Sequence, residues 1–304
     1  MVPSKESVQS AAYSDCTVSL QIGSVCCALK CKDASEYDLA KRLYRDFLTE
    51  QPADLTLELE MTSRLKPDDV SEALPETIFT HENGNRFRTS SQIISGRYDL
   101  ANRIISITAE KSLGDPDMEF NYINRLISLA YYSACKVKYD GNPPAMLVHA
   151  CGIIRHGKAI AFAGPSDTGK STIARLCGDQ HGEVLNDEMV LISRPDQSGN
   201  GISAQSAPII SDISPRCNKA APLHCILLLK RGDRTVVHNI DKAEAYLRFM
   251  RQIITPVYIG QKSGRAVYTL MADFSSEVID TIPIYELEFN LDGEALWQVV
   301  AELE

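Results

Sequence analysis

The sequence predicts an α/β core preceded by a smaller α+β part in which antiparallel sheet dominates. A short apolar strand, a glycine-bearing loop and a helical segment follow one another around Gly164–Ser171. Residues 13–112 instead show short runs of alternating apolar and polar positions, which are typical of half-buried antiparallel strands. The sequence Gly114-Asp115-Pro116 interrupts the chain between these regions. We therefore expect one domain over residues 1–115 and a second over residues 116–304.

The first region is expected to fold as several strands with one helix. The apolar pattern predicts strands over residues 17–22, 25–30, 55–61, 77–80, 86–89 and 103–108. Leu39, Leu43 and Phe47 recur at helical spacing and predict a helix over residues 35–49. Residues 81–85 are rich in turn formers and indicate a hairpin. Together these elements give the α+β part.

The second region is expected to alternate apolar strands with helices. The predicted strands cover residues 145–154, 159–163, 184–193, 223–229 and 284–289. The predicted helices cover residues 118–137, 170–176, 241–254 and 293–303. Residues 155–158 indicate a hairpin turn between the first two strands. This succession of elements is the basis for the α/β assignment.

Composition argues against several classes of function. The 304 residues include 31 Lys and Arg against 40 Asp and Glu, which gives a net charge of -9. This sign disfavours binding to nucleic-acid backbones and to anionic membrane surfaces. No run approaches the roughly 20 apolar residues of a membrane span, and the first residues do not form a signal peptide. We therefore expect a cytoplasmic protein whose nine cysteines are thiols.

One segment matches the phosphate-binding (Walker A) pattern G-x-x-x-x-G-K-[ST]. It reads Gly164, Pro165, Ser166, Asp167, Thr168, Gly169, Lys170 and Ser171, and Thr172 continues it into the helix. Glycines let backbone N–H groups converge on an anion, and the start of a helix adds its positive end. The lysine of such a loop reaches the β- and γ-phosphates, and the following hydroxyl ligates Mg²⁺. We therefore expect ATP or GTP, with Mg²⁺, at residues 164–172.

An acidic pair follows the loop. Asp187 lies 16 residues after Ser171, and Glu188 is next to it. A carboxylate near the γ-phosphate can accept the proton of a substrate hydroxyl, so Asp187 is the candidate general base. Glu188 is the candidate Mg²⁺ ligand beside Ser171, and the two carboxylates can exchange these roles. The alternative is a strand-end pair that faces solvent.

Further catalytic candidates come from position in the sequence. His149 is expected to contact phosphate or to orient Asp187, and the alternative is a core histidine bonded to backbone. Transition-state charge on a transferred phosphoryl group usually requires another cation. Arg216, Lys219 and Arg251 are the candidates for this cation.

The stretch from Met146 to Leu191 resembles the catalytic domain of the HPr kinase/phosphorylase family. His149 lies 15 residues before Gly164, as in the family, and a predicted hairpin precedes the loop. The acidic pair also follows the loop at the family's spacing. Residues 218–223 are similar to a segment of HPr-kinase-like proteins from bacterial peptide-modification clusters. The resemblance implies a phosphoenolpyruvate carboxykinase-like P-loop kinase core over residues 116–304.

This resemblance implies an ATP-dependent kinase that phosphorylates a hydroxyl, either on a serine of a small protein or peptide or on a small molecule. Residues 1–115 would recognise the substrate or mediate assembly, including assembly into a homo-oligomer. The Glu-Ile-Arg-Gly stretch of HPr kinases is absent, so HPr itself is not implied as the substrate. Two alternatives stay open: a nucleotide-binding regulatory or scaffold protein, and a phosphatase or phosphorolytic enzyme that uses the same site.

Overall fold

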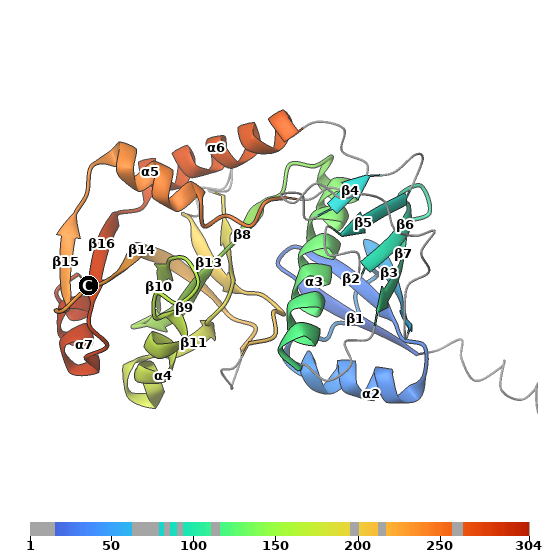
Figure 1. Ribbon diagram of the computed structural model, residues 1–304, viewed down its shortest axis with the longest axis horizontal. Coiled ribbons are helices and arrows are strands. Elements are labelled where there is room, and N and C mark those ends of the chain that lie inside the picture. The colour runs from blue at the N-terminus through green and yellow to red at the C-terminus, as the bar shows by residue number, and fades with distance from the viewer. Residues whose placement is uncertain are drawn as a thin grey trace, which may run out of the picture. The chain divides into compact units, whose positions relative to one another are not determined.

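The structure, a computed structural model, shows mixed α/β architecture with two sheets (Figure 1). It describes residues 16–62, 79–81, 86–89, 94–110, 116–194, 201–211, 217–256 and 264–303. These residues form six α-helices and one 3₁₀-helix besides the strands. They divide into two compact units, residues 16–141 and residues 142–256 with 264–303.

The sheet of the first unit has seven strands in the order β1-β2-β3-β7-β6-β5-β4. The strands are β1 (Thr17–Ile22), β2 (Val25–Lys30), β3 (Leu55–Thr62), β4 (Phe79–His81), β5 (Arg86–Thr89), β6 (Ile94–Asp99) and β7 (Ile104–Glu110). The antiparallel character predicted for this region is correct for its two ends. The central pairs β2–β3 and β3–β7 are parallel, however, so the sheet is mixed.

A crossover helix explains the parallel pair β2–β3. Helix α2 (Ala34–Leu43) and the 3₁₀-helix η1 (Arg45–Phe47) connect these strands. Asp33 caps α2, because its side chain accepts a hydrogen bond from the Glu36 backbone N–H at 2.9 Å. Helix α2 ends at Leu43, earlier than the helix predicted over residues 35–49. Strand β6 is additional to the predicted strands. The predicted hairpin residues 82–85 lie outside the described residues, although β4 and β5 do pair antiparallel.

The long helix α3 (Pro116–Tyr139) belongs to the first unit. Lys138 near its end donates to Asp54 Oδ2 at 2.9 Å and to Ser24 O at 2.8 Å. Its residues Tyr131 and Cys135 are fully buried. The compact units consequently divide after Gly141, rather than at the expected boundary between residues 115 and 116.

The sheet of the second unit has nine strands. They are β8 (Ala145–Val148), β9 (Ala150–Arg155), β10 (Lys158–Ala163), β11 (Glu183–Asn186), β12 (Val190–Ser193), β13 (Ser203–Ser206), β14 (Ala220–Arg231), β15 (Val236–Asn239) and β16 (Ile284–Phe289). Seven follow the order β11-β9-β10-β14-β13-β12-β8, while β16 pairs with β14 and with β15. Strands β13 and β15 are additional to the predicted set.

Four strands of this sheet end at the same edge. Strand β10 pairs in parallel with β14, and β14 pairs in parallel with β16. Strand β9 is antiparallel to both β10 and β11, so β11 runs in the same direction as β10. The carboxyl ends of β11, β10, β14 and β16 and the amino end of β9 therefore lie at one edge, which we call the carboxyl edge.

Two strands predicted as continuous are each broken in the structure. The predicted strand over residues 145–154 divides into β8 and β9 at His149, and the one over residues 184–193 divides into β11 and β12 at residues 187–189. Strand β8 pairs with β12, whereas β9 pairs with β11. The two segments therefore pair with each other on both sides of the breaks, and His149 lies opposite residues 187–189, where the regular pairing is interrupted.

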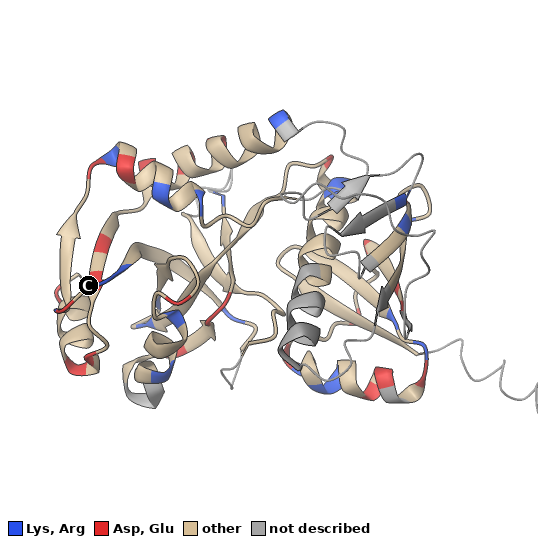
Figure 2. Ribbon diagram, viewed as in Figure 1, with Lys and Arg blue, Asp and Glu red and all other residues tan. Residues whose placement is uncertain are grey.

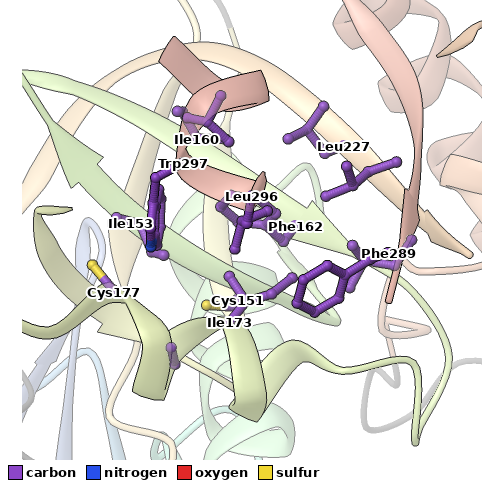
Figure 3. Packing of buried hydrophobic residues seen from close by; sticks show 14 of the residues in the cluster. Cys151, Ile153, Ile160, Phe162, Ile173, Cys177, Leu227, Phe289, Leu296 and Trp297 are labelled. Atoms are coloured by element: carbon purple, nitrogen blue, oxygen red, sulfur yellow. The ribbon is translucent and has the colours of Figure 1, made fainter. Parts of the chain in front are cut away.

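A buried apolar cluster holds the parallel strands against two helices, α4 (Lys170–His181) and α7 (Gly293–Ala301). Figure 3 shows Phe162 and Phe289 from the strands beside Ile173 of α4 and Leu296 of α7. Trp297 also belongs to the cluster, and its Nε1 donates to Leu176 O at 3.0 Å. The strand–loop–helix unit around Gly164–Ser171 is therefore anchored in a packed core.

Two more helices, α5 (Lys242–Met250) and α6 (Gly264–Thr281), contact each other in the second unit. Their buried rings Phe249 and Phe274 lie 6.3 Å apart between centroids. Helix α6 is absent from the predicted set, and α5 is shorter than the helix predicted over residues 241–254. Both α5 and α2 carry acidic and basic residues, and on α2 the acidic ones lie toward its amino end and the basic ones in its last turn (Figure 2).

The nine cysteines all lie in the described part of the chain, and no disulfide joins any of them. This agrees with the expectation of thiols. Among the helices described, none combines the length and the apolar character that crossing a membrane requires.

Candidate functional site

The candidate site lies where the carboxyl edge brings together segments that are distant in sequence. The loop after β10 begins at Gly164, and Asp187 follows β11 directly. His149 precedes Ala150, which is the residue that pairs with Ala163 at the end of β10. Ligands of open α/β sheets bind outside the carboxyl ends of strands. The topology thus places the loop, the acidic pair and His149 at one location.

The loop has the strand–loop–helix setting that the motif requires. Gly164 is enclosed, because a Cβ added there would lie 2.7 Å from Thr168 Oγ1 and 3.1 Å from Leu229 Cβ. Gly169 has φ of +108° and is the residue before α4, a conformation that glycine adopts readily. Thr168 Oγ1 donates to Pro165 O at 2.7 Å and closes the turn. Gly169 is therefore favoured by the backbone conformation, and Gly164 by the side chains that enclose it.

Lys170 is buried inside this loop. Its side chain donates to Gly164 O at 3.0 Å and to Pro165 O at 2.9 Å. Burial lowers the pKa of Lys170, and the negative charges of Glu188 and Asp187 oppose that effect. The amine thus lies within electrostatic range of both carboxylates. A cation held in this way can offer its charge to a phosphate at the loop.

Asp187 is almost completely buried, with 1% of its surface exposed. Its Oδ1 has no hydrogen-bond partner among the described residues. For Asp187, this burial contradicts the alternative of a strand-end acidic pair that faces solvent. A buried carboxylate oxygen normally has a partner, because the cost of removing it from water is otherwise uncompensated. Asp187 therefore has the capacity to accept a proton or a hydrogen bond from a ligand.

Glu188 and His149 form a pair beside Asp187. His149 Nε2 lies 3.5 Å from Glu188 Oε1. The hydrogen bond from His149 lowers the pKa of Glu188, and burial acts in the opposite direction. The His149 backbone N–H donates to Gln252 O at 2.7 Å, which fixes the residue at the break between β8 and β9. The side chain of His149 thus contacts Glu188, whereas a contact with phosphate or an orienting effect on Asp187 stays a prediction.

Asn186 is a structural residue of the site that the sequence analysis missed. It is 1% exposed, and its Oδ1 accepts from the backbone N–H groups of Glu188 and Met189 at 2.8 and 3.0 Å. Its Nδ2 donates to Ile209 O at 2.9 Å. Asparagine commonly bonds the backbone two residues further on in turns. An Asn directly before two acidic residues was therefore a usable signal.

The three candidates for the cation that stabilises the transition state differ in their relation to the site. Arg216 lies outside the described residues. Lys219 pairs with Glu183, at the opposite end of β11 from Asp187, so it does not belong to the site. Arg251 is exposed and precedes Gln252, whose carbonyl accepts from His149. Arg251 therefore stays a candidate.

The donor set fits Mg²⁺ bound together with a phosphate. Within the described ranges, no group of three His, Cys, Asp or Glu side chains is placed to hold a metal ion. Mg²⁺ at nucleotide sites usually takes one or two carboxylates and fills its other positions with phosphate oxygens and water. Glu188 or Asp187 with the hydroxyl of Ser171 matches that requirement, because Asp187 has an unpartnered oxygen.

Fold and site together define a mixed α/β protein in which a Walker A sequence and an acidic pair meet at the carboxyl edge of parallel strands. The chain belongs to the family described as SynChlorMet cassette protein ScmC, whose model matches residues 111–303. No curated protein matches the sequence. The solved structure of the HPr(Ser) kinase/phosphatase from Coxiella burnetii is similar over 51% of this chain and 94% of its own, at 12% identity. The TM-score is 0.30, which is too low to establish a shared fold.

Proposed function

We propose that the chain is an ATP- or GTP-dependent kinase that transfers the γ-phosphoryl group to a hydroxyl. The observation that carries this proposal is the buried, unpartnered Oδ1 of Asp187 within electrostatic range of Lys170. A phosphate loop alone supports nucleotide binding. A carboxylate with a vacant acceptor position beside that loop also supports proton transfer from an acceptor hydroxyl.

In the proposed reaction, the acceptor oxygen forms a bond to the γ-phosphorus while the bond to the bridging β,γ-oxygen breaks. Asp187 accepts the hydroxyl proton, and the nucleoside diphosphate leaves. Lys170 stabilises the negative charge on the phosphoryl oxygens. Mg²⁺, when bound by Ser171 and Glu188, would neutralise charge on the phosphates. His149 favours the ionised form of Glu188, because their hydrogen bond lowers the pKa of that carboxyl.

The acceptor is proposed as a serine of a small protein or peptide, or a small-molecule hydroxyl. The sequence resemblance of residues 146–191 to the HPr kinase/phosphorylase family supports a hydroxyl acceptor. Transfer can be followed with γ-labelled ATP and GTP, Mg²⁺ and an extract of the source cells. We expect the wild type to label a discrete species, and Asp187→Asn to bind nucleotide without labelling it.

Two variants complete this experiment. Lys170→Ala is expected to lose nucleotide binding, because the buried charge at the loop is removed. Asp280→Asn is the matched control, since Asp280 is a surface carboxylate paired with Lys242 at 2.5 Å. If Asp187→Asn labels the same species at the wild-type rate, Asp187 is not the base. Nucleotide binding that depends on Lys170, without any phosphoryl transfer, would favour the regulatory alternative. Release of phosphate from phosphoserine in the absence of nucleotide would favour a phosphatase.

A further inference from the structure

Leu291 lies in the connection between β16 and α7 and combines exposure with backbone strain. Its side chain is 53% exposed, and its φ is +69°. A left-handed backbone is unfavourable for a bulky apolar residue, and such strain persists where neighbouring structure enforces it. Strained residues of this kind concentrate at functional sites. Leu291 is thus an unusual residue at the carboxyl edge.

Neighbouring polar groups hold this connection in place. Asn290 Oδ1 accepts from Thr235 Oγ1 at 2.6 Å and from the Asp292 backbone N–H at 3.2 Å. Asn290 Nδ2 donates to Asp233 O at 3.2 Å. Asp292 then caps α7 by accepting from the Ala295 backbone N–H at 3.1 Å. The exposed position of Leu291 is therefore fixed by the residues on either side of it.

Leu291 borders the phosphate loop. A Cβ placed on Gly169 would lie 3.7 Å from Leu291 Cδ2 and 3.4 Å from Phe289 Cδ1. Phe289 is buried in the core, whereas Leu291 is open to solvent. An apolar side chain is thus presented to solvent directly beside the start of α4, where phosphates are expected to bind.

The order of the strands gives the bound nucleotide a direction. Strand β10, which leads into the loop, pairs with β9 on one side and with β14 on the other. The acidic pair lies beyond β9, at the end of β11, and Leu291 lies beyond β14, at the end of β16. A γ-phosphate directed toward Asp187 leaves the nucleoside to extend in the opposite direction, toward Leu291.

We propose that Leu291 is the apolar contact for the nucleoside of the bound nucleotide. This inference rests on the proposed function only in requiring that a nucleotide binds at the loop. A purine base or a ribose offers an apolar face, and covering an exposed leucine with it removes apolar surface from water. Losing most of that contact corresponds to about a tenfold loss of affinity.

The test compares a nucleotide with inorganic tripolyphosphate, which has the phosphates but no nucleoside. Calorimetry would measure the binding of ATP, GTP and tripolyphosphate, each with Mg²⁺, to the full chain. For Leu291→Ala we expect about tenfold weaker binding of the preferred nucleotide and unchanged binding of tripolyphosphate. Leu247→Ala is the matched control, because Leu247 on α5 is 54% exposed, and it should change neither affinity.

A second variant separates this effect from loss of folding. Leu291→Asn removes the apolar contact, and asparagine tolerates a left-handed backbone, so its native state should be retained. It is expected to weaken nucleotide binding as Leu291→Ala does. The assignment of Leu291 would be overturned if both variants lost equal affinity for nucleotide and tripolyphosphate, or lost affinity for neither. In that case nucleotide binding that depends on Lys170 would still support the proposed function. A wild type that binds neither probe would overturn the proposed function as well.

Discussion

Asn186 determines where the two carboxylates of the site lie, because its Oδ1 accepts from two backbone N–H groups in the β11–β12 break and its Nδ2 donates to Ile209 O. Replacing it by alanine removes the partner of two part-buried N–H groups, those of Glu188 and Met189, and of the Ile209 carbonyl. We expect Asn186→Ala to reduce the free energy of unfolding by about 2–4 kcal/mol. Urea titration would measure this. The control Asn218→Ala removes an exposed amide and should cost under about 0.5 kcal/mol. Similar losses for both variants would contradict the role of Asn186.

Glu188 is expected to give the protein an acid-sensitive contribution to stability. The hydrogen bond from His149 lowers its pKa in the folded state, so ionised Glu188 stabilises the fold. This contribution is complete above the unfolded pKa of about 4.3 and is lost as the pH falls through the lower folded value. The free energies of unfolding of wild type and Glu188→Gln should thus differ at pH 7 and converge below about pH 4. A difference independent of pH would contradict this expectation.

At the scale of elements, Gly182 allows α4 to be followed closely by β11. Its φ is +145°, and a Cβ there would lie 2.4 Å from the backbone oxygen of Ile154. Gly157, in the β9–β10 turn, has φ of +75° but no atom within 4 Å of such a Cβ. We therefore expect Gly182→Ala to destabilise by more than about 3 kcal/mol and Gly157→Ala by about 1 kcal/mol. Chemical denaturation would compare them, and equal losses would show that the contact with Ile154 is unimportant.

An ion pair joins α5 to β16. Arg248 Nη1 lies 2.5 Å from Glu286 Oε2, and Lys230 Nζ lies 3.2 Å from Glu286 Oε1. Burial acts to raise the pKa of Glu286, yet the hydrogen bonds from both cations outweigh it and hold that pKa below its usual range. We expect Arg248→Ala to cost about 2 kcal/mol, because it leaves a largely buried carboxylate poorly paired. Lys230→Ala should cost at most about 1 kcal/mol, since Lys230 is more than half exposed. The reverse order in thermal unfolding would contradict this assignment.

Strands with a strong local pattern could be predicted from the sequence. Strands β1, β2 and β16 match their predicted ranges, and the Walker A segment occurs in the expected strand–loop–helix setting. The breaks at His149 and at residues 187–189 could not be predicted, because apolar residues continue on both sides of each break. The parallel pairs of the first unit depend on contacts between residues far apart in sequence. For α6 a signal existed, since Val267, Met271, Phe274 and Val278 recur at helical spacing and are buried.

At the scale of the whole molecule, the net charge of -9 contrasts with the local chemistry of the site. An anionic ligand must be held by fixed groups, because the overall field is unfavourable for it. Lys170 and the amino end of α4 supply such groups at the loop. Elsewhere both signs of charge occur on the same helix, as on α2 and α5 (Figure 2).

The distribution of cysteines predicts a pattern of chemical labelling over the whole chain. Cys16 and Cys217 are half-buried, whereas the other seven are buried. Burial raises the pKa of Cys31 to about 11 and that of Cys135 to about 12, which reduces their thiolate fraction. Iodoacetamide at pH 8 should therefore alkylate Cys16 and Cys217 first, and the remainder only in denaturant. Mass spectrometry of a time course would test this, and early labelling of Cys135 would contradict it.

The acidic pair and Leu291 lie at opposite ends of the carboxyl edge, and this separation affects how members of the family can diverge. In the proposed function the acceptor side is formed by the β8–β9 and β11–β12 connections, while the proposed nucleoside contact, Leu291, belongs to the β16–α7 connection. These segments are encoded in different parts of the gene, and mutations in one leave the other intact. Under the proposed function, we expect homologues to differ in the phosphoryl acceptor while they keep the same nucleotide preference.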